Sequence, residues 1–291
     1  MKYLLLLLFS FQACASEKKS GPVNPLPALN EIITVETQPG FVRWVSFAIE
    51  PGQETAELWC KDQQLKHAAL GQGRRFAFIA ETYFSDLKPY TCRLILKNKT
   101  EIPIVNFLVK SFKYKEEKLK VDFRTVRLSK KDLKRAQKEQ RMLAGLYTQS
   151  ASEPYFNRAF VAPLDSVITS IYGNRRVYNN AHKSQHLGTD YRAAVGVPIP
   201  AVNRGRVLFA GDLFYTGGTV IIDHGMDIFT VYGHLSEVKT QAGQIVNQGD
   251  IVALSGHTGR SSGPHLHWGV KIHGHYVNGY SLIEETKKQF P

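Results

Sequence analysis

Apolar and polar positions divide the chain into two β-rich regions joined by one helical stretch. Between about residues 30 and 128, short runs of β-branched and aromatic residues are separated by Pro, Gly, Asn or charged turns. The runs of strand length are residues 31–36, 41–49, 75–80, 90–96, 104–109 and 119–123. About seven short strands in a hundred residues are typical of a sandwich, so we expect residues 30–128 to form a β-sandwich domain.

Residues 129–152 have a helical pattern and are predicted to form a linker helix. Ser129 followed by Asp132 has the spacing of a capping box. Apolar residues fall roughly on one helical face, and Lys and Arg fill the others. Two interpretations of this basic helix stay open: its charges contact an acidic polymer or lipid headgroups, or they form a solvated face, as charge runs usually do.

The region from 153 to 291 is again β in pattern, with abundant Gly. Its strand-length runs are residues 167–176, 207–210, 219–223, 228–232, 251–254 and 267–272. No alternation of strands with crossover helices is present, so we expect an antiparallel sheet. The chain as a whole is therefore predicted to be mainly β, with an N-terminal β-sandwich, a basic linker helix and a C-terminal antiparallel β domain.

The composition narrows the choice of partners. The 291 residues are 43% hydrophobic, enough for two domains with cores, and carry a net charge of +12. Such a charge suits nucleic acid, anionic lipid or an anionic wall polymer. We recognise no nucleic-acid-binding motif, so no nucleic-acid partner is expected. We also expect a monomer.

The N-terminus has the pattern of an export signal, which predicts a protein of the periplasm or cell envelope. Lys2 precedes an apolar run that is too short to span a membrane and ends in small residues, so residues 1–15 are predicted to be a signal peptide. Two processing routes are open: cleavage after Ala15, or a lipobox-like site at residues 11–14 that makes Cys14 a lipidated membrane anchor. We favour the lipoprotein route. Residues 16–29 are interpreted as a flexible tether.

The two remaining cysteines, Cys60 and Cys92, lie in the predicted sandwich. In an oxidising compartment they are expected to form a disulfide, whereas without export they would be two buried free thiols. Tyr90, two residues before Cys92, resembles the tyrosine corner of immunoglobulin-like folds. This single local match suggests an immunoglobulin-like arrangement.

Candidate metal ligands are concentrated in two short motifs of the C-terminal region. His265 and His267 are two residues apart in a run with strand character, so their imidazoles share one face. His186 and Asp190 also share a face, and Gly188 between them favours an extended segment. Three such N and O donors suffice for a catalytic zinc ion with one position open to water.

The other histidines receive different interpretations. His234 closes a predicted strand and is a candidate for proton transfer. His224 is expected to be a hydrogen-bonded turn residue. His257, His273 and His275 lie in predicted loops and are expected to be exposed.

Residues 155–283 resemble peptidase family M23, the LytM or lysostaphin-type zinc endopeptidases. The resemblance rests on an ordered series of motifs: residues 169–175, 186–190, 198–201, 205–207, 223–225, 232–235, 243–246, 256–259 and 263–268. It implies that His186, Asp190 and His267 bind one Zn²⁺ per chain and that His234 and His265 are the catalytic histidines. It also implies a LytM-type peptidase domain over residues 153–291 that hydrolyses peptide cross-links of bacterial peptidoglycan in cell-wall remodelling or lysis.

The residues themselves are compatible with that chemistry. Two histidines and one carboxylate leave zinc with a net positive charge. Because the chain has no His-Glu-x-x-His motif, a histidine is the natural proton acceptor. Tyr172 and Arg175 are candidates for substrate binding, with simple packing as the alternative. The alternative function is a non-catalytic peptidoglycan-binding or amidase-activating protein that retains the fold.

Overall fold

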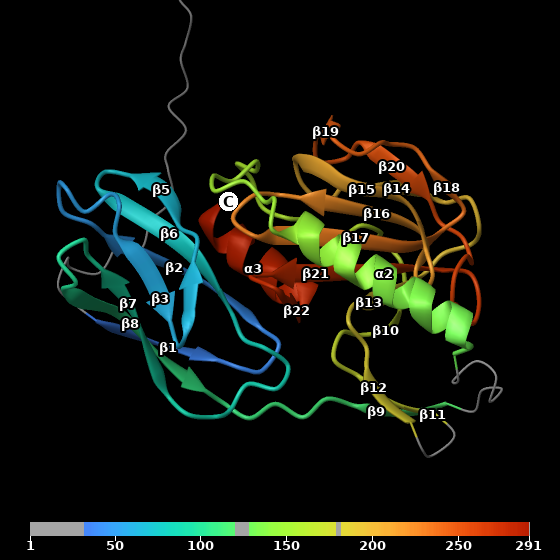
Figure 1. The fold of residues 1–291 in the computed structure, drawn as a ribbon, viewed down its shortest axis with the longest axis horizontal. Coiled ribbons are helices and arrows are strands. Elements are labelled where there is room, and N and C mark those ends of the chain that lie inside the picture. Colours follow the sequence, from blue (N-terminus) through green and yellow to red (C-terminus); the bar gives the residue numbers. More distant parts are fainter. Residues whose placement is uncertain (1–31, 120–127, 179–181, 291) are drawn as a thin grey trace, which may run out of the picture. The chain divides into compact units, whose positions relative to one another are not determined.

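Strands dominate this protein, which confirms the predicted mainly β class. The computed structural model describes residues 32–119, 128–178 and 182–290 (Figure 1). The predicted signal peptide 1–15, the tether 16–29, Cys14 and most of the run 119–123 lie outside the described residues. The helices that the structure describes are α2 (Lys130–Tyr147) and α3 (Gly279–Gln289). Neither of these two is long and apolar enough to cross a membrane.

Two sheets form the N-terminal region. The larger runs in the order β1-β8-β7-β3-β4 and the smaller in the order β2-β6-β5. Their bounds are β1 Ile33–Thr37, β2 Val42–Ala48, β3 Glu57–Cys60, β4 Gln63–Leu65, β5 Ala68–Gly71, β6 Arg74–Ala80, β7 Tyr90–Ile95 and β8 Glu101–Val109. Both sheets contribute to one buried cluster, which includes Phe47, Leu58, Ile79 and Phe107. A sandwich was predicted, and its immunoglobulin-like topology stays a prediction.

Cys60 and Cys92 form the predicted disulfide. The two residues lie opposite each other in the β3–β7 register, and both are buried. Nearby Tyr90 donates its hydroxyl hydrogen bond to the Glu81 carboxylate, unlike the tyrosine corner, in which the hydroxyl bonds to the backbone.

One large antiparallel sheet organises the C-terminal region, as predicted. Its order is β10-β13-β21-β17-β16-β15-β19, and β22 pairs with β21. Its bounds are β10 Ile168–Ser170, β13 Thr189–Arg192, β15 Gly205–Leu213, β16 Gly217–Asp223, β17 Ile228–Leu235, β19 Ile245–Val246, β21 His265–Ile272 and β22 His275–Val277. Every residue of β17 is buried, which makes this strand the centre of the sheet.

Two three-stranded sheets flank the large one. The first runs β14-β20-β18, with β14 Pro198–Pro200, β18 Glu237–Val238 and β20 Ile251–Leu254. The second runs β12-β11-β9, with β9 Glu116–Leu119, β11 Arg175–Tyr178 and β12 His182–Gln185. In this second sheet β9 pairs in parallel with β11, so a strand from before α2 completes a hairpin of the C-terminal region.

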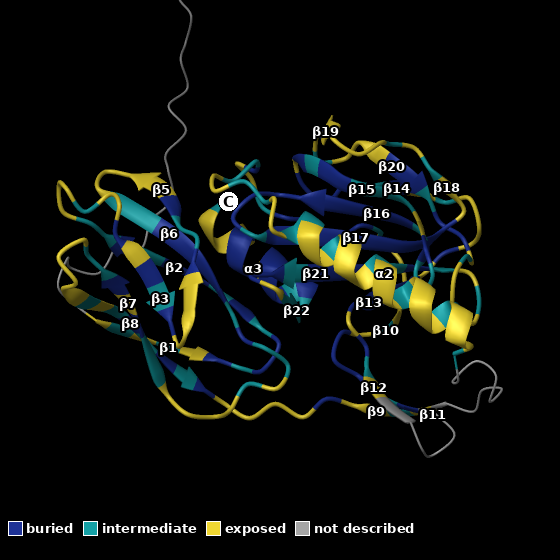
Figure 2. Cartoon of the chain, viewed as in Figure 1, coloured by how far each residue is buried: buried dark blue, intermediate teal, exposed yellow. Residues whose placement is uncertain are grey.

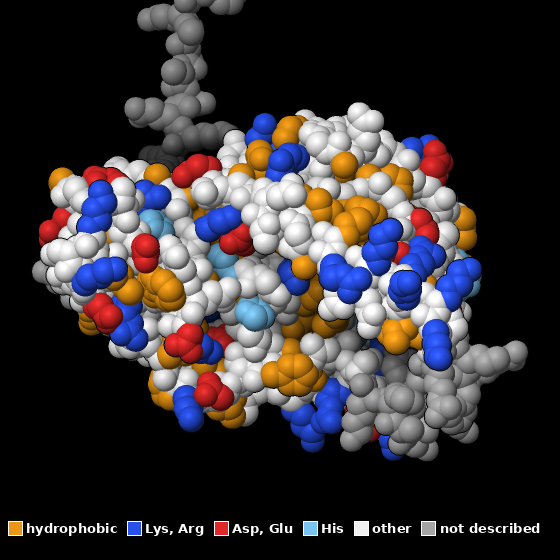
Figure 3. Space-filling view, in the orientation of Figure 1, with side chains coloured by type: hydrophobic (Ala, Val, Ile, Leu, Met, Phe, Trp, Pro, Cys, Tyr) orange, Lys and Arg blue, Asp and Glu red, His pale blue; other side chains and the backbone are white. Residues whose placement is uncertain are grey.

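The helix α2 is the predicted basic helix. Ser129 caps it, because its hydroxyl accepts a hydrogen bond from the Asp132 N–H at 3.1 Å. None of its residues is buried, and Lys and Arg side chains gather on the surface over it (Figures 2 and 3). Its last turns pack with Leu143, Leu146 and Tyr147 against a small apolar cluster of the large sheet, and further back Arg135 contacts the Asp212 carboxylate at 2.8 Å.

The helix α3, which sequence reasoning missed, joins the two β regions. Asn278 caps it, and its buried face contacts β2. Ser281 Oγ accepts a hydrogen bond from the Val42 N–H at 3.0 Å, and Glu285 Oε2 accepts one from the Trp44 N–H at 2.9 Å. A single hydrophobic cluster therefore includes Trp44 and Phe78 together with the core of the C-terminal sheet. The predicted boundaries 30–128, 129–152 and 153–291 stay a prediction.

Two expectations about histidines are corrected. His275, expected to lie exposed in a loop, begins strand β22 and is half-buried. The second correction concerns His273. It was predicted to be exposed, yet only 6% of it is accessible. Its Nε2 lies 3.0 Å from the Phe78 carbonyl oxygen, which accepts the hydrogen bond. β5 pairs with β6 only as far as Phe76, so beyond that residue β5 supplies no hydrogen-bond donor to the backbone of β6. The His273 ring supplies one to the Phe78 carbonyl oxygen instead.

The disulfide gives a stability prediction. Replacing Cys60 and Cys92 together by Ala should lower the free energy of unfolding by about 3 kcal/mol, because the cross-link restricts the unfolded chain between them. Urea denaturation measures the change. Wild-type protein treated with reductant should show the same shift, and equal midpoints for oxidised and reduced protein would contradict the prediction.

Candidate functional site

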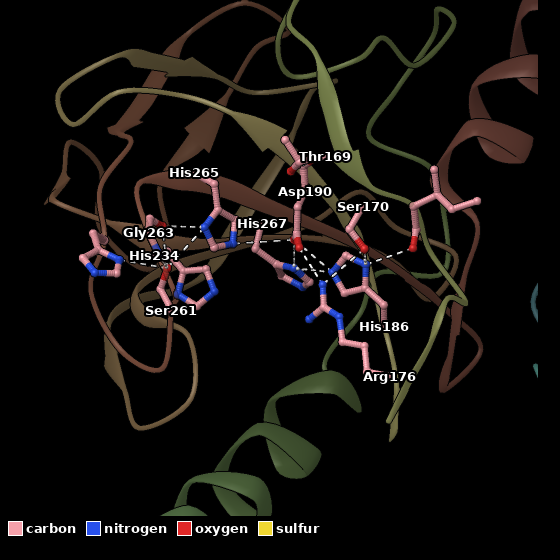
Figure 4. Close-up of polar contacts among 12 residues, drawn as sticks. Thr169, Ser170, Arg176, His186, Asp190, His234, Ser261, Gly263, His265 and His267 are labelled. Atoms are coloured by element: carbon pink, nitrogen blue, oxygen red, sulfur yellow. Dashed lines mark hydrogen bonds and ion pairs between the residues drawn. The ribbon is translucent and has the colours of Figure 1, made fainter. Parts of the chain in front are cut away.

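Three predicted ligands converge at the β13–β21 pair. Asp190 lies opposite His267 in the antiparallel register, so their side chains share one face. His186 follows β12 and reaches the same point. Asp190 Oδ1 lies 2.9 Å from His186 Nε2 and 2.8 Å from His267 Nδ1, and the two nitrogens are 3.2 Å apart (Figure 4).

The donor set fits a metal ion. His186 Nδ1 lies 2.9 Å from the Ile171 carbonyl oxygen, which can only accept, so Nδ1 carries the proton and Nε2 carries a lone pair. That lone pair points at an Asp190 oxygen, which is also an acceptor. Two acceptors this close repel each other unless a cation lies between them.

Arg176 controls the second oxygen of the aspartate. Its Nη2 donates to Asp190 Oδ2 at 2.8 Å, which leaves Oδ1 to face the histidines. Sequence reasoning singled out the neighbouring Arg175 instead. In strand β11 the two side chains point to opposite sides, and only the register of β11 decides which one reaches Asp190.

Glu117 of β9 contacts two side chains that themselves contact candidate ligands: Arg176, which binds Asp190, and Ser170, which lies beside His186. Its carboxylate accepts from Asn174 Nδ2 at 2.6 Å and from Ser170 Oγ at 3.2 Å, and it lies 3.5 Å from Arg176 Nε. Ser170 Oγ in turn is 3.1 Å from His186 Nδ1. Sequence reasoning missed Glu117, because its position opposite Arg176 follows from the long-range β9–β11 pairing.

The two histidines predicted to be catalytic lie beside the ligands. The rings of His234 and His265 have centroids 4.7 Å apart, and His265 Nε2 is 3.7 Å from Asp190 Oδ1. His234 Nδ1 donates to the Thr258 carbonyl oxygen at 2.8 Å, and His265 Nδ1 donates to the Gly263 carbonyl oxygen at 2.8 Å. In the neutral form each ring therefore has an unprotonated Nε2 available to a substrate.

His234 is held in an unusual backbone conformation. Its φ is +63°, in the left-handed region that costs a residue with a Cβ on the order of 1–2 kcal/mol. The hydrogen bond from its N–H to the Thr216 carbonyl oxygen at 2.6 Å holds this conformation. Burial lowers the pKa of His234 to about 4, so the imidazole is neutral at pH 7.

The predicted substrate residues occupy different environments. Tyr172 is buried, and its hydroxyl donates to the Tyr276 carbonyl oxygen at 2.7 Å, so its contacts support the packing interpretation. Arg175 is exposed, and its backbone N–H bonds to Lys115 O. His224 is a buried turn residue bonded to the Arg204 carbonyl oxygen, as expected.

Gly188 explains how the ligands come so close. A Cβ on this residue would lie 2.5 Å from the Trp268 carbonyl oxygen and 2.7 Å from Cε1 of His267. Real Cβ atoms essentially never show such distances. Only glycine lets the chain between His186 and Asp190 cross directly over β21.

Comparisons with known proteins show what this chain is similar to. Residues 184–279 match the sequence model of peptidase family M23. The chain is 37% identical over 119 residues to peptidoglycan DD-endopeptidase ShyA of Vibrio cholerae, an alignment that covers 40% of this chain and 28% of the relative. It is 39% identical over 101 residues to the DD-carboxypeptidase/endopeptidase Mpg of Neisseria meningitidis, covering 35% of this chain and 23% of the relative. The chain thus spans about a quarter of the length of these curated relatives.

A solved structure from Pseudomonas aeruginosa, assigned to peptidase M23, shares the fold over most of the chain. The TM-score is 0.65 at 24% sequence identity, with 88% of this chain and 97% of that chain covered. The likeness therefore extends beyond the residues that match the family model.

The close approach at Gly188 gives the first prediction for the site. Gly188→Ala should weaken metal binding by roughly tenfold or more, because the added methyl displaces His267. Metal content after dialysis and titration against a competing chelator measure the change. Gly145→Ala in α2 is the control, since a Cβ there meets nothing within 4 Å. Wild-type affinity in the Gly188 variant would contradict the prediction.

Glu117 gives the second prediction. Glu117→Gln keeps the shape but removes the charge that holds Arg176 and Ser170, so metal affinity should fall by roughly tenfold. Glu116→Gln is the matched control, because Glu116 is the exposed neighbour in the same strand. The same chelator titration applies, and equal affinities for the two variants would remove the role given to Glu117.

Proposed function

Since residues 184–279 belong to peptidase family M23, we propose that this protein is a zinc metalloendopeptidase that hydrolyses peptide cross-links of bacterial peptidoglycan. One observation carries the proposal: three metal donors converge beside two further histidines whose Nε2 atoms are free to handle protons. The names of the relatives, a peptidoglycan DD-endopeptidase and a DD-carboxypeptidase/endopeptidase, support the substrate.

In this proposal His186, Asp190 and His267 hold one zinc ion per chain. When bound, zinc supplies a Lewis acid that polarises the scissile carbonyl and activates water. The two neutral imidazoles and the single carboxylate leave a net positive charge at the site. Arg176 supports this set, because it binds the outer oxygen of Asp190 and keeps Oδ1 directed inward.

His234 and His265 share the proton transfers. One Nε2 would accept the proton of the attacking water and later deliver it to the leaving amine, and the other ring would stabilise charge on the carbonyl oxygen in the form that carries a proton on Nε2. Both orientations are fixed by hydrogen bonds from Nδ1 to backbone carbonyls. The two rings come from β17 and from β21, so they face the reacting centre from different strands. Which ring is the base stays open.

The proposed place of action is the cell envelope, where the wall polymer lies. The disulfide between Cys60 and Cys92 agrees with an oxidising compartment. Export through residues 1–15 and anchoring through a lipidated Cys14 belong to the same proposal.

The competing function is a non-catalytic wall-binding or amidase-activating protein. Retention of all five site residues in a single constellation favours the enzyme. Incubation of purified wall with the protein, followed by mass spectrometry of the soluble products, separates the two functions. Released or uncross-linked peptides support the enzyme, and zinc-loaded protein that yields no product supports the competing function.

Two substitutions should separate metal binding from proton transfer. His267→Ala should lose both zinc and activity, and its zinc content should fall to background. His234→Ala should keep zinc and lose activity by roughly 10²–10⁴-fold. Metal analysis and hydrolysis of a cross-linked peptide measure both effects, with His275→Ala as the control histidine. If purified wild-type protein binds no stoichiometric zinc, the ligand assignment fails.

A further inference from the structure

An aromatic cleft opens one backbone segment away from the candidate metal site. It has a volume of about 700 Å³ and is lined by Pro39, by residues 83–84 and 112–116, and by Arg175 at the start of β11. Tyr83 and Tyr114 stack in it with centroids 4.9 Å apart, and Phe112 meets Tyr114 edge-on at 4.7 Å. Phe84 is 81% exposed and Phe112 is 41% exposed. Aromatic rings that face solvent together in one hollow mark a binding surface.

The cleft also carries positive charge. Lys113, Lys115 and Arg175 line it and are exposed, against one acidic residue, Glu116. Aromatic faces stack on the C–H faces of sugar rings, and the cations suit carboxylates. Nucleic acid would also use aromatic and basic groups. It carries one phosphate per nucleotide, however, and an aromatic surface with this small excess of positive charge does not require so highly charged a partner.

The cleft is built on the same backbone segment as the metal site. Tyr114 packs over Gly173, where a Cβ would lie 2.2 Å from its ring. The Gly173 N–H donates to the carbonyl oxygen of the ligand His186 at 2.8 Å. Arg175 faces the cleft, and the next residue, Arg176, binds Asp190. Because the side chains of Arg175 and Arg176 point to opposite sides of β11, a ligand that occupies both places has to pass around this strand, which requires an extended polymer.

We infer that this cleft binds the glycan strand of peptidoglycan, with its acidic stem peptides, while a cross-link of the same polymer lies at the metal site. The inference rests on the proposed function. Phe84, Phe112 and Tyr83 supply the stacking surface for sugar rings, and Lys113, Lys115 and Arg175 face the carboxylates. The cleft then selects cross-links that are still attached to glycan.

A binding experiment tests the cleft without cleavage. In a His234→Ala background, Phe84→Ala with Phe112→Ala should weaken co-sedimentation with purified insoluble peptidoglycan by roughly tenfold or more. Leu87→Ala is the control, because Leu87 is 52% exposed in the same loop region but does not line the cleft. Soluble glycan that carries peptides should compete. Equal competition by free peptides or by a single-stranded oligonucleotide would overturn the inference.

A kinetic experiment separates this inference from the proposed function. In the active protein, the double Phe variant should keep its kcat/KM on a glycan-free cross-linked peptide and lose roughly tenfold on intact wall, through KM. Equal losses on both substrates, or no loss on wall, would refute the cleft. If the wild-type protein leaves the peptide and the wall intact, the proposed function fails, and the binding experiment still reports on the cleft.

Discussion

The structure depends on holding three acceptor atoms within about 3 Å of one another. Asp190 Oδ1, His186 Nε2 and His267 Nδ1 occupy that small space, and the lone pairs of Asp190 Oδ1 and His186 Nε2 repel without a cation. Rigid secondary structure holds these atoms close together despite the repulsion. The β13–β21 register fixes two ligands, and the backbone of Gly188 lets the third approach.

The same constraint explains why a distant strand belongs to the site. A carboxylate with a free outer oxygen could rotate away from the metal, so Arg176 is needed on Oδ2. Arg176 is itself a long side chain with many rotamers, and Glu117 of β9 restricts it. Through β9 the N-terminal region contributes to the metal site, and α3 fixes that region with hydrogen bonds to Val42 and Trp44. Stability of the shared core and geometry of the site are therefore linked.

Local pattern was enough to predict most strands and to single out the residues that converge at the candidate site, but long-range pairing was not predictable. The alternation of side chains placed His265 and His267 on one face, and the disulfide followed from two cysteines in one region. Glu117 could not be found, because no local pattern of residues 116–119 says which strand they join. The expectation that His273 is exposed was wrong for the same reason, since its hydrogen-bond partner, the Phe78 carbonyl oxygen, lies 195 residues away in sequence. The helix α3 was missed because it is short and its amphipathic pattern is weak. Its buried face is explained only by packing in one cluster with Trp44 and Phe78, which lie far away in the sequence.

A peptidase for a cross-linked network cannot enclose its substrate, because the polymer continues on both sides of the scissile bond. Such an enzyme must protect its metal ligands and still leave the reacting centre open. Two of the three candidate ligands, His186 and Asp190, are buried, whereas the third, His267, and the neighbouring His265 have side chains that keep 15% and 16% exposure. An open centre offers little contact area for affinity, so binding has to come from outside it. In the proposed function, the aromatic, positively charged cleft one backbone segment away meets that need without closing over the chain.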